Sequence, residues 1–423
     1  MATRRDQGRL NDNLADRFAA TRRLTLDLAA PLSDADASIQ PNPDASPAKW
    51  HLAHTTWFLE TFVLRDLGVA PFDERFAYLF NSYYDGEGER HARDRRGMLS
   101  RPSLDTIRDW RAHVDEAVER ALPSLPPPAL ALIELGIQHE QQHQELLLTD
   151  ILATFAANPL EPAYRHCDPG LAPGQATQRQ ETGLLRDARN DGWTEHRGGM
   201  DMIGAAPDSF SFDCEGPRHE VLIRPHAIAT APVTNAQWDE FIADAGYSTP
   251  SLWLAEGWDW VRREGIAAPL YWLDDGTAFT LAGRRPRDPG APVSHISFFE
   301  ADAFARWAGA RLPREEEWEV AAAAADPALG QQLDAAAPVI PRAKSGWFGS
   351  VWEWSASAYL AHPGYKPAEG TVGEYNGKFM SGQFVLKGAS CATPRGHSRA
   401  SYRNFFPPAA RWQFTGVRLA RDL

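Results

Sequence analysis

The sequence predicts two domains of different class, an all-helical bundle followed by an α+β domain, in a chain of 423 residues. This length exceeds one ordinary compact domain and suits two or three. Apolar residues recur with helical spacing in residues 1–165, whereas residues 191–423 hold most of the 15 tryptophans and short apolar runs between Gly- and Pro-rich turns. We expect the polar, non-periodic residues 166–190 to be a linker.

Four helices are predicted in the first domain. The first covers residues 10–28, and the second starts with Ser46 as its N-cap and Pro47 at its first helical position. The third begins at Ser103, and the fourth starts after Pro126, Pro127 and Pro128 and runs to about Ala157. Because these helices carry apolar stripes without strand-like alternation, they predict a four-helix bundle.

The second domain alternates short strands with short helices. Apolar runs at residues 221–223 and 384–386 are typical of strands. Capping boxes begin at Thr234 and Ser297, each followed by an aromatic-rich helical turn. Few helices, short strands and many irregular loops indicate a compact α+β domain.

Composition narrows the range of partners and compartments. Hydrophobic content is 43% and charged content 23%, which is typical of a soluble globular protein. A net charge of −13 argues against nucleic-acid or anionic-membrane partners. We expect no membrane span and no export signal, because no long apolar run occurs. The cysteines Cys167, Cys214 and Cys391 form no disulfide framework, which fits a cytoplasmic protein.

The segment Gln138–Glu145 predicts a metal site. His139 and His143 are four residues apart in a predicted helix, so both imidazoles lie on one face. Imidazoles in a core-facing stripe are costly unless something binds them. A third ligand must come from another element, and His51 and His54 are both candidates that position alone does not separate. An all-imidazole set suits ferrous iron and also zinc.

The same segment also matches HExxH, the zinc hydrolase helix. In that alternative Glu140 is the general base and Glu161 the position of a third ligand. Against it, Glu161 lies between two prolines beyond the predicted helix end. Asp150 shares the face of His143 and could orient a ligand, but we expect it to be a solvated helix residue.

Both halves resemble one known family. Residues 50–55, 81–84 and 139–143 are similar to the DinB-like iron domain of ergothioneine-type sulfoxide synthases, the hercynine oxygenases. The second half resembles their formylglycine-generating-enzyme-like domain, which has a C-type-lectin-like fold. The segments that carry this second resemblance are residues 232–235, 292–297, 307–313, 351–354, 385–390 and 416–418. The two resemblances together cover nearly the whole chain.

The resemblance implies a non-haem iron oxidoreductase of ergothioneine biosynthesis. Its Fe(II) would be held by His54, the second histidine of the WHLAH motif, with His139 and His143. The implied reaction joins a thiol sulfur to hercynine, the trimethylated form of histidine, and dioxygen supplies the sulfoxide oxygen. The implied proton donor is a tyrosine hydroxyl, Tyr83 or Tyr84 in the long connection from residue 68 to 102. In some members this tyrosine lies in the second domain, where Tyr365 is the counterpart.

The resemblance also implies a substrate-binding set. Gln142 and Asn404 would contact hercynine, and Phe405 would offer an aromatic face to its trimethylammonium group. Arg93 and Arg96 are candidates for the carboxylate of the thiol, which favours guanidinium.

One departure bears on the thiol. Members that use γ-glutamylcysteine carry an acidic residue where this chain has Phe406, so L-cysteine is favoured and γ-glutamylcysteine stays possible. Selenoneine- or ovothiol-type synthases with another donor or acceptor, and a zinc hydrolase, remain alternatives. Formylglycine generation needs a pair of cysteines that bind copper. We do not expect this activity, because the second domain offers only Cys214 and Cys391, which are far apart in sequence. The second domain is then a lid and substrate wall.

Overall fold

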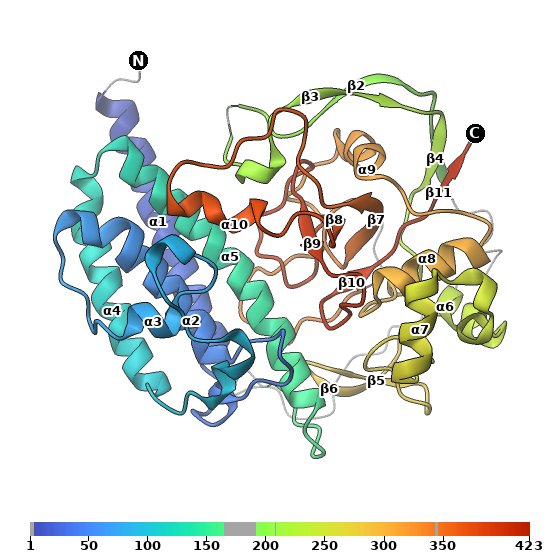
Figure 1. Cartoon of the computed structure of the whole chain (residues 1–423), viewed down its shortest axis with the longest axis horizontal. Coiled ribbons are helices and arrows are strands. Elements are labelled where there is room, and N and C mark those ends of the chain that lie inside the picture. The colour runs from blue at the N-terminus through green and yellow to red at the C-terminus, as the bar shows by residue number, and fades with distance from the viewer. Residues whose placement is uncertain (1–3, 165–191, 208, 343–345) are drawn as a thin grey trace.

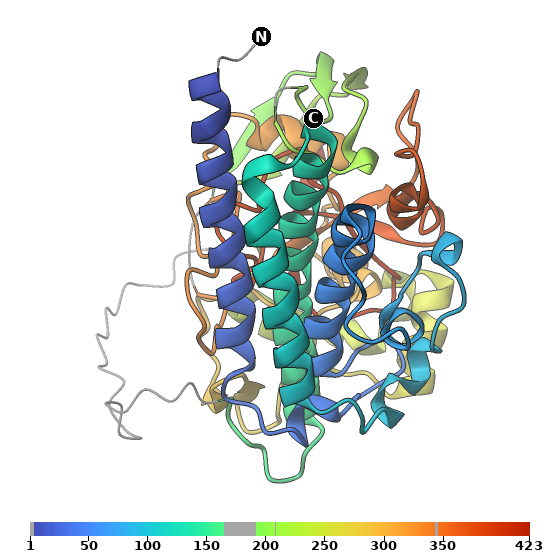
Figure 2. The same ribbon diagram turned by 90° about the vertical axis from the view of Figure 1, so that its left-hand side faces the viewer.

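The computed structural model describes residues 4–164, 192–207, 209–342 and 346–423. The predicted linker, residues 166–190, lies outside the described residues. The four predicted helices are present and lie side by side (Figures 1 and 2). They are α1 (Arg4–Ala29), α2 (Ala48–Leu59), α4 (Leu104–Ala121) and α5 (Pro127–Ala156). The prediction of a four-helix bundle is therefore confirmed.

The helix starts follow local capping chemistry, with one correction. The Ser103 side chain accepts a hydrogen bond from the backbone N–H of Thr106, as its position before α4 predicts. At α2 the N-cap is Pro47, not Ser46. The Ser46 hydroxyl instead accepts a hydrogen bond from Arg96, because the long connection folds back over the start of α2. That connection contains α3 (Phe76–Phe80) and two short turns, Asp85–Glu87 and Arg93–Met98.

Every residue of α2 is buried. Helices α4 and α5 contact it, as does α3 from the long connection. Such enclosure explains how polar residues such as His51 and His54 come to lie in the interior, where they need hydrogen-bond or metal partners.

Four small sheets and several short helices make up the described residues of the second half. A three-stranded antiparallel sheet has the order β1-β4-β11, so the first and last strands of this half share one sheet. A four-stranded sheet has the order β10-β7-β8-β9, and β2 with β3 and β5 with β6 form hairpins. The strands are β1 (Trp193–His196), β2 (Gly199–Ile203), β3 (His219–Ile223), β4 (His226–Ala229), β5 (Thr277–Thr280), β6 (Gly283–Pro286), β7 (Trp352–Ala358), β8 (Phe384–Gly388), β9 (Asn404–Phe406), β10 (Thr415–Gly416) and β11 (Ala420–Asp422).

Short helices pack around these sheets (Figure 1). They are α6 (Asn235–Ala243), α7 (Ala255–Glu264), α8 (Phe298–Trp307), α9 (Glu315–Ala322) and α10 (Glu374–Gly377). The capping boxes predicted at Thr234 and Ser297 are both formed, at the starts of α6 and α8. The predicted strands at 221–223 and 384–386 lie within β3 and β8.

Helix α5 is the wall that both halves share (Figure 1). On it, the carboxylate of Glu145 accepts hydrogen bonds from Trp352 (2.7 Å), Ser390 (2.5 Å) and Thr393 (2.7 Å) of the second half. Phe414 of the second half belongs to the same apolar cluster as the bundle core. The two halves are therefore joined by a packed interface.

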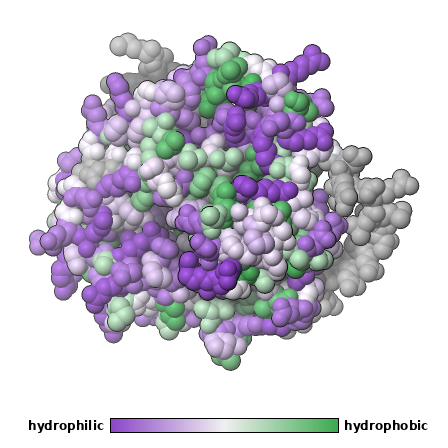
Figure 3. All heavy atoms as spheres, turned by 45° about the vertical axis from the view of Figure 1, so that its right-hand side comes forward, coloured by the Kyte–Doolittle hydropathy of each residue, from purple (hydrophilic) through white to green (hydrophobic). Residues whose placement is uncertain are grey.

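In the face shown in Figure 3, hydrophilic side chains dominate and apolar ones are scattered among them. No helix in the described part of the chain is both long and apolar enough to span a membrane.

Candidate metal centre

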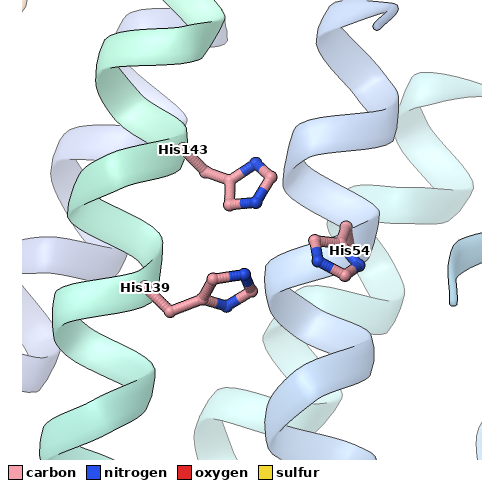
Figure 4. A group of neighbouring side chains, drawn as sticks. All are labelled: His54, His139 and His143. Atoms are coloured by element: carbon pink, nitrogen blue, oxygen red, sulfur yellow. The ribbon is translucent and has the colours of Figure 1, made fainter. Parts of the chain in front are cut away.

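Three buried histidines meet between α2 and α5. His54 projects from α2, and His139 and His143 project from successive turns of α5 (Figure 4). One ring nitrogen from each lies within 4.8 Å of the others. Among the described residues, this is the one group of three or more histidine, cysteine or carboxylate side chains placed closely enough to hold a metal ion. The i, i+4 spacing thus brings its two imidazoles together as predicted.

The environment keeps these imidazoles neutral. Burial lowers the pKa of His139 to about 4 and lowers the pKa of His54 and of His143 well below the ordinary range. Nδ1 of His54 lies 2.7 Å from the carbonyl oxygen of Phe80. Because a carbonyl only accepts, Nδ1 carries the proton and Nε2 keeps its lone pair. Three neutral imidazoles are a donor set that fits ferrous iron and also zinc.

His51 is not part of this cluster. Its Nδ1 lies 2.9 Å from Nδ1 of His143, and its Nε2 lies 3.1 Å from Oδ2 of Asp150. The structure therefore separates the two histidines that sequence position left equivalent. Our expectation that Asp150 is solvated is wrong, because Trp412 of the second half covers this end of α5 and bonds the carboxylate.

The geometry does not fit the zinc hydrolase reading of HExxH. Glu140 is enclosed by Arg22 and Arg111, which pair with its carboxylate, and by Thr25, which donates a hydrogen bond at 2.5 Å. Burial alone would raise the pKa of Glu140, but the two guanidinium groups hold it at about 2. Such a weak base does not activate water. Glu161 pairs with Arg284 at 3.0 Å, away from the three histidines.

A cavity adjoins the histidines and is lined from both halves of the chain. His143 contributes to its wall. The cavity collects the predicted substrate residues Arg93, Arg96, Gln142, Asn404 and Phe405, together with Tyr83 and Phe406. These residues are distant in sequence, and the packing of the second half against α5 brings them together.

Arg96 and Arg93 differ in their surroundings. Arg96 is buried, its guanidinium lies 3.4 Å from the ring centre of Trp50, and its two terminal nitrogens donate to the hydroxyls of Ser46 and Ser82. Burial lowers its pKa to about 9. A buried cation held by neutral hydroxyls favours an incoming anion. Arg93 is exposed and donates to the hydroxyl of Tyr83 at 2.9 Å.

The three candidate tyrosines occupy different sites. Tyr83 lines the cavity. Tyr84 is buried and packs its ring against Trp57 and Phe62. The hydroxyl of Tyr365 donates to Asp213 at 3.2 Å, and Tyr365 is not among the residues that line the cavity.

A polar chain that the sequence did not suggest leads to Gln142. Its side-chain nitrogen donates to the Tyr402 hydroxyl at 2.7 Å, which lies 3.1 Å from Nε2 of His397. Nδ1 of His397 lies 2.7 Å from the side-chain oxygen of Gln138. Because Tyr402 and His397 come from the second half, the spacing of residues along α5 does not predict these hydrogen bonds. The second half thus orients a cavity-lining glutamine on α5.

The second half offers no cysteine pair among the described residues. Cys214 and Cys391 are both buried and free. Burial raises the pKa of Cys214, which lines the cavity, to about 12, so its thiol stays protonated at neutral pH.

Comparisons with known proteins agree with this architecture. Residues 17–147 match the DinB superfamily, and residues 188–339 match the sulfatase-modifying factor enzyme 1-like domain. A hercynine oxygenase of Mycolicibacterium smegmatis is 34% identical and covers 97% of this chain and 99% of its own length. The hercynine oxygenase of Mycobacterium tuberculosis is 33% identical with the same coverage.

The second half also has relatives of its own. A formylglycine-generating enzyme of Thermomonospora curvata is 36% identical over 29% of this chain and 45% of its own length. The predicted fold class, a DinB-like bundle followed by a formylglycine-generating-enzyme-like domain, is confirmed.

Proposed function

The chain belongs to the hercynine oxygenase family, and we propose that it is a non-haem iron, dioxygen-dependent sulfoxide synthase that joins hercynine to a thiol in ergothioneine biosynthesis. The observation that carries this proposal is the cluster of His54, His139 and His143 beside a cavity lined by polar groups from both halves. We also propose the division into a bundle domain, residues 1–165, and a second domain, residues 191–423.

The three imidazoles are the residues that would hold the metal. We propose Fe(II) because an all-histidine set with open positions suits dioxygen chemistry, whereas Glu140 cannot serve a zinc hydrolase. Ferrous iron in such a site supplies the activation of dioxygen. The remaining steps depend on how the chain binds and orients two small molecules and moves protons.

The proposed reaction balances in atoms and electrons. Hercynine loses the C–H hydrogen between its two ring nitrogens, and the thiol loses its S–H hydrogen as the C–S bond forms. One oxygen atom of dioxygen becomes the sulfoxide oxygen, and the other leaves as water with the two hydrogens. Dioxygen therefore accepts four electrons, two from C–S bond formation and two from sulfur.

The cavity wall has groups for both substrates. Gln142, held by Tyr402, and Asn404 at the start of β9 are proposed to bind hercynine. The ring of Phe405, stacked on Tyr359 at 4.1 Å, is rigid enough to face the trimethylammonium group. Phe406 lies in the same wall and cannot pair with a charged group of a γ-glutamyl arm, which favours L-cysteine over γ-glutamylcysteine.

We expect Arg96→Lys to raise the KM for the thiol and leave that for hercynine nearly unchanged. The Arg96 guanidinium already donates to two hydroxyls and has further N–H groups for a carboxylate, whereas an ammonium cannot span all three partners. Loss of a charge-assisted hydrogen bond predicts an increase of roughly 10- to 150-fold. Steady-state kinetics with each substrate varied in turn measures this. Arg95→Lys, at an exposed site on the same turn, is the control, and an unchanged thiol KM in Arg96→Lys would remove Arg96 from the thiol site.

We propose Tyr83 as the proton donor during C–S bond formation. An arginine only donates, so the Tyr83 oxygen accepts from Arg93 and its own O–H is directed elsewhere. We expect Tyr83→Phe to lower kcat by roughly 10²-fold, in line with loss of a general acid. Rapid-quench measurement of sulfoxide formation tests this. Tyr84→Phe is the control in the same loop, and a larger loss in that variant would reverse the assignment.

The function is tested with protein loaded anaerobically with ferrous iron. Hercynine is added with cysteine or with γ-glutamylcysteine, in air and under nitrogen, and products are identified by mass. We expect a cysteine adduct with one added oxygen, in air alone. Product with γ-glutamylcysteine alone would keep the reaction and overturn the preference for cysteine. Product under nitrogen would indicate a thiol transferase instead.

A further inference from the structure

We propose that Trp412, Asp150 and His51 form a hydrogen-bonded chain that fixes the tautomer of His143 and so presents its Nε2 atom to the metal. The inference rests on the metal site proposed above. It assigns a positioning role to three residues outside the histidine cluster, one of them from the second half of the chain.

The chain begins at a carboxylate that two donors hold in place. Oδ1 of Asp150 accepts a hydrogen bond from the indole Nε1 of Trp412 at 3.0 Å. Oδ2 accepts one from the backbone N–H of Ser46 at 2.7 Å. Neither donor can accept, so both oxygens of Asp150 act as acceptors. Asp150 is 4% exposed, so these hydrogen bonds also offset the free-energy cost of removing its carboxylate from water.

The direction of the next two hydrogen bonds follows from that carboxylate. Nε2 of His51 lies 3.1 Å from Oδ2 of Asp150, so Nε2 carries a proton. In neutral His51 the lone pair is then on Nδ1, which lies 2.9 Å from Nδ1 of His143. Nδ1 of His143 must therefore donate, which leaves the lone pair on its Nε2.

His54 has the same tautomer, with the proton on Nδ1, but a different partner fixes it. There a backbone carbonyl, that of Phe80, accepts from Nδ1 at 2.7 Å. His143 lies mid-helix on α5, and its partner is a second imidazole instead of a carbonyl. That partner has two possible tautomers, so it defines His143 only when a fixed acceptor holds its far side. Asp150 is that acceptor, and metal ligands are commonly oriented in this way.

Trp412 makes the chain depend on the second half. Its indole lines the substrate cavity and bonds the carboxylate on α5. Without that bond, one oxygen of Asp150 loses its partner and the carboxylate can turn about its side-chain bonds. His51 then has no single orientation to follow. The second half is therefore more than a wall of the cavity, since it helps to define the metal ligands on the bundle.

Trp412→Phe tests this chain, because it keeps an aromatic ring and removes the N–H donor. We expect anaerobic titration with cobalt(II) alone to give an affinity roughly 10- to 100-fold lower than that of the unmodified protein, with altered visible absorption bands. Trp307→Phe is the matched control, since the Trp307 indole also donates to a carboxylate, Asp244, at 3.1 Å. We expect Trp307→Phe to bind cobalt(II) normally.

A second pair of variants separates positioning from packing. His51→Leu removes the acceptor for Nδ1 of His143, whereas the side-chain oxygen of glutamine in His51→Gln can accept from it. We expect weak cobalt(II) binding in the first variant and partial recovery in the second. Equal affinity in the unmodified protein, Trp412→Phe and His51→Leu would overturn this inference and leave the metal site intact. If the unmodified protein binds no cobalt(II), the metal site itself fails, and the proposed function with it.

Discussion

We expect His139→Ala to give a folded protein that no longer retains ferrous iron. His139 supplies one of three imidazoles, and the two that remain, on different helices, cannot hold the ion against water. Product formation from hercynine and a thiol should disappear with the metal. Metal analysis after anaerobic loading and desalting measures the first effect, and product analysis measures the second.

The fold of this variant should persist, because the bundle core is formed mainly by apolar residues away from the cluster. Circular dichroism and thermal unfolding check that point. His113→Ala replaces an exposed histidine on α4 and is the matched control, with normal iron content expected. Normal iron content in His139→Ala itself would contradict the assignment of the metal site.

We expect Glu140→Gln to destabilise the fold by about 3–5 kcal/mol, because a neutral amide removes the carboxylate that pairs with two buried arginines. Arg22 keeps a second carboxylate partner, Asp115, whereas Arg111 loses the carboxylate of its ion pair. Arg111 and Arg22 both pair with Glu140, and both are buried. Urea unfolding at neutral pH measures the change in the free energy of unfolding. Glu116→Gln, at an exposed ion pair with Arg120 on α4, should change it by no more than about 0.5 kcal/mol.

The pH dependence of this effect has a defined sign. The folded pKa of Glu140 is depressed from 4.5 to about 2. Its contribution is therefore complete above pH 4.5 and is lost as the pH falls through about 2. The difference between Glu140→Gln and the unmodified protein should shrink over that range. A stable variant that had lost all catalysis would instead support a general base at this position and revive the zinc hydrolase alternative.

The bundle and the pair of histidines on one face of α5 were predictable because they depend on local rules. Helical periodicity and the cap at Ser103 act over a few residues, and the i, i+4 spacing of His139 and His143 places them on one face whatever surrounds the helix. Resemblance to the family selected His54. In the structure His54 lies with His139 and His143, and His51 contacts His143 and Asp150 instead.

The errors concern contacts between distant segments. Asp150 was expected in solvent because nothing near it in sequence shows that Trp412 will cover it. The sequence predicts Ser46 as the cap of α2, but its hydroxyl accepts a hydrogen bond from Arg96 of the long connection instead. The roles of Tyr402 and His397 were missed for the same reason, because each forms its contacts only when the second half packs on α5.

One measurement tests the central claim most directly. Protein loaded with ferrous iron is mixed with hercynine and cysteine under dioxygen enriched in the heavy oxygen isotope, and the product is analysed by mass. The account predicts a hercynine–cysteine sulfoxide whose single added oxygen is the heavy isotope. A sulfoxide oxygen that comes from water, or no C–S product with any thiol, would contradict the assignment of this chain as a dioxygen-dependent sulfoxide synthase.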